Sequence, residues 1–339
     1  MAELPPVESL TVRAIWGAVE AAQDRSERTY LGASVIGDDC ERKLWLAFRW
    51  AYEPEWFDGR KLSIFQTGHL WEARLIELLR GAGIHVDDID PETGEQFLVR
   101  FAGGHAGGHM DGKALGVPDA PKTWHVFEAK SHHDKSFQEL KRLGVQKAKP
   151  QHYAQMQVYM HLDGETRALY VAVNKNTDEI YVERVAYDVA TALHLVAKAE
   201  RIITAPTPPA CGCPPYFLKA GYGCAKLEGL FPRRNCRSCL HSTPRLDGDA
   251  RWTCERWDRD LSADDQRAGC PRHLFIPQLV PGEQIDCDPA AERVVYLMRD
   301  GRRWVDGEPE RETRPVEDLR RANEFGVTAN EITFEGAAA

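Results

Sequence analysis

The segment Trp124-His-Val-Phe-Glu-Ala-Lys-Ser131 predicts a β-strand that carries an acidic and a basic side chain on one face. Because side chains alternate along a strand, Glu128 and Lys130 point to the same side of the sheet. The preceding segment Gly108-His-Met-Asp-Gly-Lys-Ala-Leu115 also reads as a strand and places Asp111 directly before a glycine. We therefore expect Asp111, Glu128 and Lys130 to lie close together on neighbouring strands.

This set of residues suits the hydrolysis of phosphodiester bonds. Carboxylates are hard oxygen ligands for Mg²⁺, and a nearby cation orients water and offsets developing charge. Glu-x-Lys alone is common on surface strands, so the prediction depends on its neighbours. Glu72 lies on the helix before the first strand and offers a third carboxylate. Gln151, Gln155 and Tyr159 recur at helical spacing after Lys130, as one polar stripe or as a solvated helix face.

Hydrophobic periodicity along the chain predicts an α/β core. Segments with helical spacing are interleaved with short segments of strand character, and Gly, Pro and Asp lie between the expected strands. A proline-rich segment at 205–209 follows the last helix. We expect helices at 8–25, 39–50, 65–80, 150–162 and 189–203, and strands at 96–101, 108–115, 124–131, 168–174 and 179–187.

Composition divides the chain into four parts. Residues 1–60 are expected to form an N-terminal helical segment, and residues 61–205 to form the α/β core. Residues 206–280 contain most of the cysteines and are expected to form a small metal-binding region. Residues 281–339 are expected to be a C-terminal extension that is partly disordered.

The charge distribution favours contact with nucleic acid at a local surface only. The formal net charge is −9, which argues weakly against tight, sequence-independent binding to phosphates. The tail at 306–335 is rich in acids, whereas the segment 130–149 carries six Lys or Arg against two acids. The chain has no apolar run near the roughly 18 residues that cross a bilayer and no secretory signal, so we expect a cytoplasmic location without membrane contact.

Two histidines, His132 and His133, directly follow the expected catalytic strand. Contact with phosphate or metal is one interpretation, and solvation at a strand end is the other, which we favour. The basic side chains that follow suit contact with a nucleic-acid backbone; they are Lys135, Lys141, Arg142, Lys147 and Lys149.

The order Gly-x-x-x-Glu, Asp-Gly, Glu-x-Lys and Gln-x-x-x-Tyr resembles the RecB-like and phage lambda exonuclease-like (YqaJ-type) nucleases of the PD-(D/E)XK superfamily. The segment Tyr153-Ala-Gln-Met-Gln157 is especially similar to the lambda type. The resemblance covers about 140 residues of the chain. It implies a restriction-endonuclease-like core with a mixed central sheet flanked by helices, and a deoxyribonuclease that depends on Mg²⁺ or Mn²⁺.

The resemblance also implies a role for each residue of the motifs. Asp111, Glu128 and Glu72 would be the metal ligands, and Lys130 would position or activate the attacking water. Gln155 and Tyr159 would steady the site and the DNA. RecB-type members carry His where this chain has Glu72, so this position follows the lambda pattern.

Asp119 competes with Asp111 for the role of the aspartate ligand. Pro118-Asp119 is a literal Pro-Asp pair before the Glu-x-Lys motif. We favour Asp111, because Asp119 lies among Gly116, Pro118 and Pro121 in what reads as a hairpin loop.

A first group of cysteines comprises Cys211, Cys213 and Cys224, which is one thiolate short of a complete site. Cys40 is the only cysteine in the first 200 residues and can complete it. This pattern resembles the iron–sulfur RecB-like nucleases, and the resemblance implies that the four residues hold a 4Fe–4S cluster. The Cys211-x-Cys213 spacing is tighter than in that family, and an ordinary buried thiol at Cys40 is an alternative.

A second group offers five candidate ligands for structural zinc. Cys236-x-x-Cys239 forms one knuckle, Cys254 and Cys270 follow, and His273 is an alternative ligand. Ligands exchanged between the two groups are a further alternative, and Cys287 remains outside both.

Taken together, these features predict an exonuclease that acts on DNA ends, single-stranded or duplex, in phage or bacterial recombination and repair. A single-strand annealing or recombination protein is an expected partner. The alternatives are a structure-specific or restriction-type endonuclease and a non-catalytic DNA-binding recombination protein. The sequence gives no basis for polarity or oligomeric state.

Overall fold

A computed structural model describes residues 9–24, 26–213 and 229–307 of the chain. Packing divides the chain into two units, and neither is a continuous stretch of sequence. Unit 1 comprises Met1–Arg28, Glu55–Val99 and Gly108–Leu195, and unit 2 comprises Thr29–Pro54, Arg100–Gly107 and Val196–Ala339.

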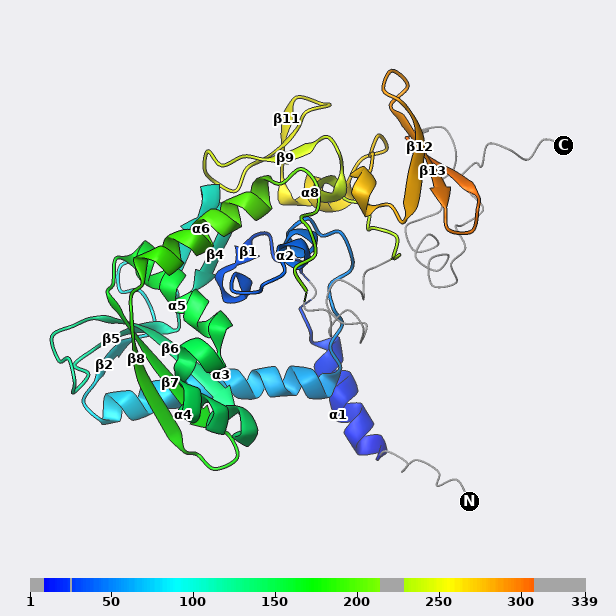
Figure 1. Ribbon diagram of the computed structural model, residues 1–339. Helices are drawn as coiled ribbons and strands as arrows, with labels where there is room; N and C mark the ends of the chain where they lie inside the picture. The colour runs from blue at the N-terminus through cyan, green and yellow to red at the C-terminus, as the bar shows by residue number, and fades with distance from the viewer. Residues whose placement is uncertain (1–8, 25, 214–228, 308–339) are drawn as a thin grey trace. The chain divides into compact units, whose positions relative to one another are not determined.

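A five-stranded mixed sheet forms the centre of unit 1 (Figure 1). Its strand order is β2–β5–β6–β7–β8. Strands β6 and β7 pair in parallel, and the other neighbours pair antiparallel. The strands are β2 (His85–Asp87), β5 (Gly112–Leu115), β6 (His125–His132), β7 (Arg167–Asn174) and β8 (Ile180–Ala186).

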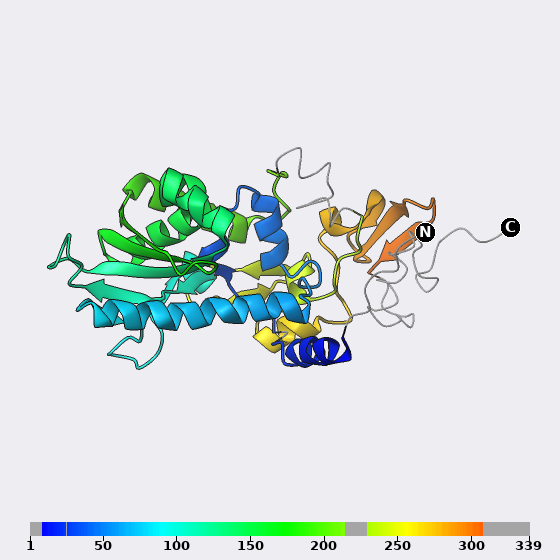
Figure 2. The same ribbon diagram turned by 90° about the horizontal axis from the view of Figure 1, so that it is seen from below.

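Helices cover both faces of this sheet (Figure 2). Helix α3 lies along one face, where its Leu75 and Ile76 pack with Phe127 and Val171 of the strands in one apolar cluster. Helices α4 and α5 lie on the other face, and α1 packs against α3. Their bounds are α1 (Leu10–Ala21), α3 (Gly59–Gly81), α4 (Asp134–Ala148) and α5 (Pro150–Asp163).

The alternation of β6 separates an apolar face from a polar one. Phe127 and Ala129 belong to the cluster beneath α3. Glu128 and Lys130 therefore point to the opposite side of the sheet, as the sequence pattern predicts. The core of unit 1 thus fixes the direction in which the acid–lysine pair projects.

Unit 2 contains short sheets joined by loops. One antiparallel sheet has the order β11–β10–β9, and another has the order β12–β13–β14. Phe231, Phe275, Tyr296 and Trp304 form part of an apolar cluster beside the second sheet. The elements are α2 (Glu41–Phe48), β9 (Ser242–Pro244), β10 (Trp252–Cys254), β11 (Arg259–Leu261), α8 (Ala263–Ala268), β12 (Gly282–Asp288), β13 (Arg293–Met298) and β14 (Arg303–Asp306).

Four further elements contain, or lie next to, the sequence positions at which the chain passes from one unit to the other. A third sheet has the order β1–β4–β3, with β1 and β4 parallel. The elements are β1 (Leu31–Gly32), β3 (Leu98–Phe101), β4 (Ala106–His109) and α6 (Val189–Thr204).

The mixed α/β class predicted from the sequence is confirmed, but several element boundaries differ. The expected strand at 108–115 is two strands, β4 and β5, separated at Met110 and Asp111. Helix α3 begins six residues earlier than expected, because the Asp58 side chain caps it by accepting a hydrogen bond from the Lys61 backbone N–H at 2.7 Å. The sequence analysis did not predict α4, β2 or the strands β12 to β14. No helix in the described ranges is both long and apolar enough to cross a membrane.

Candidate active site and cysteine groups

Asp111, Glu128 and Lys130 come together in unit 1. The Lys130 ammonium forms an ion pair with Glu128 Oε1, and its Nζ lies 3.6 Å from Asp111 Oδ2. Glu128 is fully buried, whereas the side chains of Asp111 and Lys130 are 14% and 26% exposed. The three groups therefore form a charged cluster that is open to solvent at one side.

The position of Asp111 is fixed by the backbone of strand β6. Its Oδ2 accepts a hydrogen bond from the Ala129 N–H at 2.8 Å, midway between Glu128 and Lys130. The next residue, Gly112, has φ +150°, and a Cβ there would lie 2.5 Å from the Asp87 carbonyl oxygen. The glycine that follows Asp111 is thus required by the close approach of β2.

Burial and the neighbouring charges shift the pKa values of Glu128 and Lys130. Burial raises the pKa of Glu128, the Lys130 charge opposes the shift, and Asp111 adds to it. For Lys130, burial lowers the pKa, but the two carboxylates outweigh it and the pKa rises. Glu128 Oε2 is buried without a hydrogen-bond partner. A buried carboxylate oxygen that lacks a donor is suited to a cation.

Glu72 approaches this cluster from helix α3. Burial raises its pKa, and the charge of Asp111 raises it further. Its Oε2 lies 3.8 Å from Nδ1 of the exposed His69. The three carboxylates are less tightly gathered than the thiols of Cys40, Cys211 and Cys213, the one group of metal-binding atoms in the described residues whose members all lie within 4.8 Å of one another.

Gln155 and Tyr159 point inward from helix α5. The Gln155 Nε2 donates to the Tyr159 hydroxyl at 3.2 Å, and that hydroxyl donates to the His109 carbonyl at 2.8 Å. Tyr159 therefore holds the chain two residues before Asp111. Gln151, which the spacing placed on the same stripe, is exposed. The half-buried His152, three residues before Gln155, extends the stripe instead.

The structure places Asp119 away from this cluster. Asp119 is exposed in the turn between β5 and β6, where its carbonyl oxygen accepts a hydrogen bond from Arg184 at 3.4 Å. Asp111, in contrast, contacts both the strand and the lysine of the Glu-x-Lys motif.

The expectation that His132 is solvated at the strand end is wrong. His132 is 8% exposed, because helices α4 and α5 cover this face of β6. Strand alternation carries the relevant signal, since His132 follows Lys130 by two residues and shares its face. The expectation failed because the sequence analysis did not predict helix α4.

In unit 2, Cys40 lies beside Cys211 and Cys213, although about 170 residues separate them in the sequence. Cys40 is the N-cap residue of helix α2. A Cβ at Gly212 would lie 2.7 Å from the Asp39 carbonyl oxygen, so the Cys-Gly-Cys sequence permits this close approach. Cys224, the expected fourth ligand, lies outside the described residues.

The cysteines of the second group surround a 3₁₀ turn of unit 2. Cys236 and Cys239 flank this turn, and Cys239 N–H donates to the Cys236 carbonyl at 3.0 Å. Cys254 ends β10 and pairs with Ser242 of β9. Cys270 is held near the turn by Arg234, which donates to its carbonyl at 2.8 Å. His273 Nε2 lies 3.2 Å from the Ser238 hydroxyl, and Cys287 is exposed on β12.

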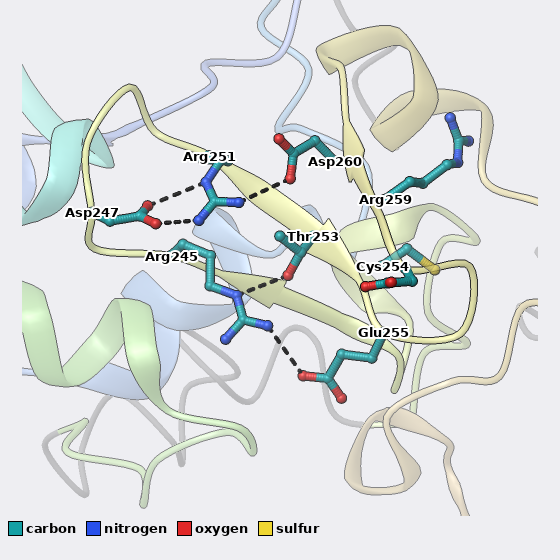
Figure 3. Close-up of a pocket in the computed structure, with 9 residues that line it drawn as sticks. Arg245, Asp247, Arg251, Thr253, Cys254, Glu255, Arg259 and Asp260 are labelled. Carbon is teal, nitrogen blue, oxygen red and sulfur yellow. Dashed lines mark hydrogen bonds and ion pairs between the residues drawn. The ribbon is translucent and has the colours of Figure 1, made fainter.

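A hollow of about 540 Å³ lies over the β9–β10–β11 sheet (Figure 3). Its arginines are paired with carboxylates: Arg251 with Asp247 and Asp260, and Arg245 with Glu255. The third arginine of the hollow, Arg259, is paired with Asp265, and Asp258 adds a fourth acidic side chain to the lining. Only Cys254 connects the hollow with the predicted sites. It offers no unbalanced positive charge for a phosphate.

No protein-family model and no curated protein matches the chain. Among solved structures, the chain is similar to the alkaline exonuclease LHK-Exo from Laribacter hongkongensis, with 15% identity and a TM-score of 0.38 over 56% of this chain and 90% of that chain. LHK-Exo in complex with dAMP gives 14% identity and a TM-score of 0.37 over the same shares. At TM-scores below 0.5, these overlaps do not establish a shared fold.

Proposed function

We propose that the protein is a DNA nuclease that depends on Mg²⁺ or Mn²⁺, built on a PD-(D/E)XK core in unit 1. The observation that carries the proposal is the cluster of Asp111, Glu128 and Lys130, in which a buried carboxylate oxygen lacks a donor. A bound divalent cation would polarise the phosphate and lower the pKa of a bound water. Asp111, Glu128 and Glu72 are the residues that would hold it.

Side chains of the protein would orient the water, stabilise developing charge, position Asp111 and contact the DNA. The Lys130 ammonium, held against Glu128, orients the water and offsets charge that develops on the phosphate. Gln155 and Tyr159 keep the segment before Asp111 in place through the His109 carbonyl. The exposed basic residues of α4, such as Lys135 and Lys147, offer contacts to the DNA backbone. Lys141 is already paired with Glu179 and contributes less.

We infer that the substrate is a DNA end and that the reaction is exonucleolytic, as part of recombination or repair. This step rests on the resemblance of the motifs. A structure-specific endonuclease on the same core is the second candidate.

The test is digestion of end-labelled linear DNA, single- and double-stranded, beside covalently closed circular DNA, with Mg²⁺ or Mn²⁺. An exonuclease releases labelled nucleotides from linear DNA and leaves the circles intact. Cleavage of the circles would favour the endonuclease, and binding without metal-dependent cleavage of any substrate would contradict the nuclease proposal.

For unit 2 we propose a 4Fe–4S cluster held by Cys40, Cys211, Cys213 and Cys224. The proximity of the first three thiols supports it. Nearby, the pKa of Lys43 is lowered by burial and raised more strongly by Asp38 and the two thiols Cys213 and Cys40, so its cation is suited to an anionic cluster.

We further propose structural zinc at Cys236, Cys239 and Cys254, with Cys270 or His273 as the fourth ligand. Arg49 supports this site. Its buried guanidinium donates to the carbonyls of Arg237, Ser242 and Ala205, and burial lowers its pKa to about 10.

Metal analysis of anaerobically purified protein tests both centres of unit 2. Iron with acid-labile sulfide and a visible absorption band, lost in Cys40→Ser, would support the cluster. Zinc lost in Cys239→Ser would support the second centre. Zinc without iron would contradict the cluster, and iron without zinc would contradict the second centre.

A further inference from the structure

Three polar side chains, two of them buried and one half-buried, lie next to the acid–lysine cluster of unit 1 and have no role in the proposed reaction. They are His132 of β6, His152 of α5 and Tyr170 of β7. Tyr170 is fully buried and is the register partner of Glu128 on the neighbouring parallel strand. Side chains of such partners lie on the same face of a sheet. Tyr170 therefore stands beside the carboxylate of the catalytic strand.

The three residues form a continuous hydrogen-bonded bridge. The Tyr170 hydroxyl lies 3.0 Å from His132 Nε2 and 2.9 Å from His152 Nδ1. The other nitrogen of His132 lies 3.2 Å from the Ser136 hydroxyl at the start of α4. A phenol can donate to one imidazole while it accepts from the other, so two neutral histidines satisfy it completely.

The surroundings keep both imidazoles neutral. Burial, together with the charges of Lys130 and Lys149, lowers the pKa of His132 to about 4 and that of His152 to about 3. Burial also raises the pKa of the Tyr170 phenol. The side chains of the bridge are therefore uncharged, and they do not compete with the carboxylates for the ammonium of Lys130.

Hydrogen bonds of the bridge and of Tyr159 connect helix α5 to the chain on either side of the cluster. Tyr159 bonds to the carbonyl of His109, two residues before Asp111. His152 bonds through Tyr170 to His132, two residues after Lys130. Lys130 lies between Glu128 and His132 on one strand face. The bridge therefore lies on the side of Lys130 that is away from Glu128.

We propose that His132, Tyr170 and His152 are positioning residues that hold the Lys130 ammonium against Glu128 and Asp111. The proposal rests on the proposed nuclease function for its effect on catalysis, but not for its effect on Lys130 itself. Without the bridge, the flexible lysine side chain would sample positions away from the carboxylates.

The first test is steady-state cleavage of DNA by Tyr170→Phe, which removes only the hydroxyl group. We expect kcat to fall about tenfold to a hundredfold, with KM for DNA and the half-saturating Mg²⁺ concentration within about twofold. Tyr181→Phe is the matched control, because it removes a hydroxyl that bonds to Glu183 in the same sheet. It should leave kcat within about twofold.

A conservative pair separates positioning from a general loss of packing. The side-chain amide of Asn reaches the position of a histidine Nδ1, so His152→Asn should keep the bond to Tyr170 and most of the activity. His152→Leu should lose activity as Tyr170→Phe does, at a similar melting temperature. Equal loss in Asn and Leu variants, or unchanged kcat in Tyr170→Phe, would overturn the proposal.

The second test does not need activity. Limited acetylation with acetic anhydride, read by mass spectrometry, measures how accessible and how basic Lys130 is. Lys130 should react at least about threefold faster in Tyr170→Phe than in wild type and Tyr181→Phe, while Lys135 is unchanged. Equal Lys130 labelling in all three proteins would refute the positioning role even if DNA is cleaved. If Lys130 is labelled faster in Tyr170→Phe but wild type does not cleave DNA, the proposed nuclease function is refuted and the positioning role is not.

Discussion

The two units differ in how their chemistry is built. In unit 1, the charged cluster comes from residues on adjacent strands, and its key pair is two residues apart in one strand. In unit 2, the thiols of Cys40 and Cys211 meet across about 170 residues of chain. The first arrangement depends on the pleat of a sheet, and the second on how loops and a helix end pack. We therefore expect substitutions in unit 1 to change the reaction and substitutions in unit 2 to change stability.

The largest effect is expected for Asp111→Asn, and it tests whether Asp111 or Asp119 is the aspartate of the proposed active site in unit 1. Asp111→Asn should reduce the rate of metal-dependent cleavage by about a thousandfold, because it removes a charge that faces Lys130 and that we propose as a metal ligand. Asp119→Asn, in an exposed turn, should retain activity within about twofold. Single-turnover rates on end-labelled DNA provide the measurement. An active Asp111→Asn protein beside an inactive Asp119→Asn protein would reverse the assignment.

The next effect concerns the stability of unit 2. Cys40→Ser should release the bound metal and lower the melting temperature by about 5 °C or more, because metal binding is coupled to folding. Cys287→Ser is the matched control, since Cys287 is exposed and outside both groups. Differential scanning calorimetry with metal analysis checks both variants. Equal melting temperatures with full metal content in Cys40→Ser would show that Cys40 is an ordinary buried thiol.

The smallest effect is a pH dependence confined to unit 2. Burial raises the pKa of Asp306 to about 7, although its carboxylate accepts a hydrogen bond from the Phe275 N–H at 2.8 Å. Its contribution to stability is therefore present below pH about 4 and is lost as the pH rises to about 7. Asp306→Asn should remove this slope and raise the free energy of unfolding at pH 8 by about 2 kcal/mol. Denaturation at pH 5 and pH 8 measures it, and an unchanged slope in the variant would contradict the assignment.

The sequence predicts unit 1 better than unit 2 for physical reasons. Alternation along β6 is enough to place Glu128 and Lys130 on one face, and the glycine after Asp111 marks the close approach of β2. The same alternation predicts the face on which His132 lies, but its burial depends on how helix α4 packs. Tyr170 carries no local signal at all, since its role comes from parallel pairing with Glu128.

In unit 2, the spacing of the cysteines predicts a metal-binding region but not which thiols meet. Cys211 and Cys213 are close in sequence, whereas the position of Cys40 depends on the start of helix α2 and on the absence of a side chain at Gly212. For the second group, too, the spacing of the cysteines does not predict which thiols meet. Pairing of β9 with β10 brings Cys254 close to the Cys236–Cys239 turn, and such pairing follows from tertiary packing.

The most direct test of the central claim is the cleavage rate of end-labelled linear DNA by wild type and Lys130→Ala, measured across a titration of Mg²⁺ under single-turnover conditions. Circular dichroism of both proteins serves as the control for folding. We predict metal-dependent cleavage by wild type and a loss of at least about a hundredfold in a folded Lys130→Ala protein. Cleavage by Lys130→Ala at the wild-type rate, or no cleavage by wild type at any metal concentration, would contradict the account.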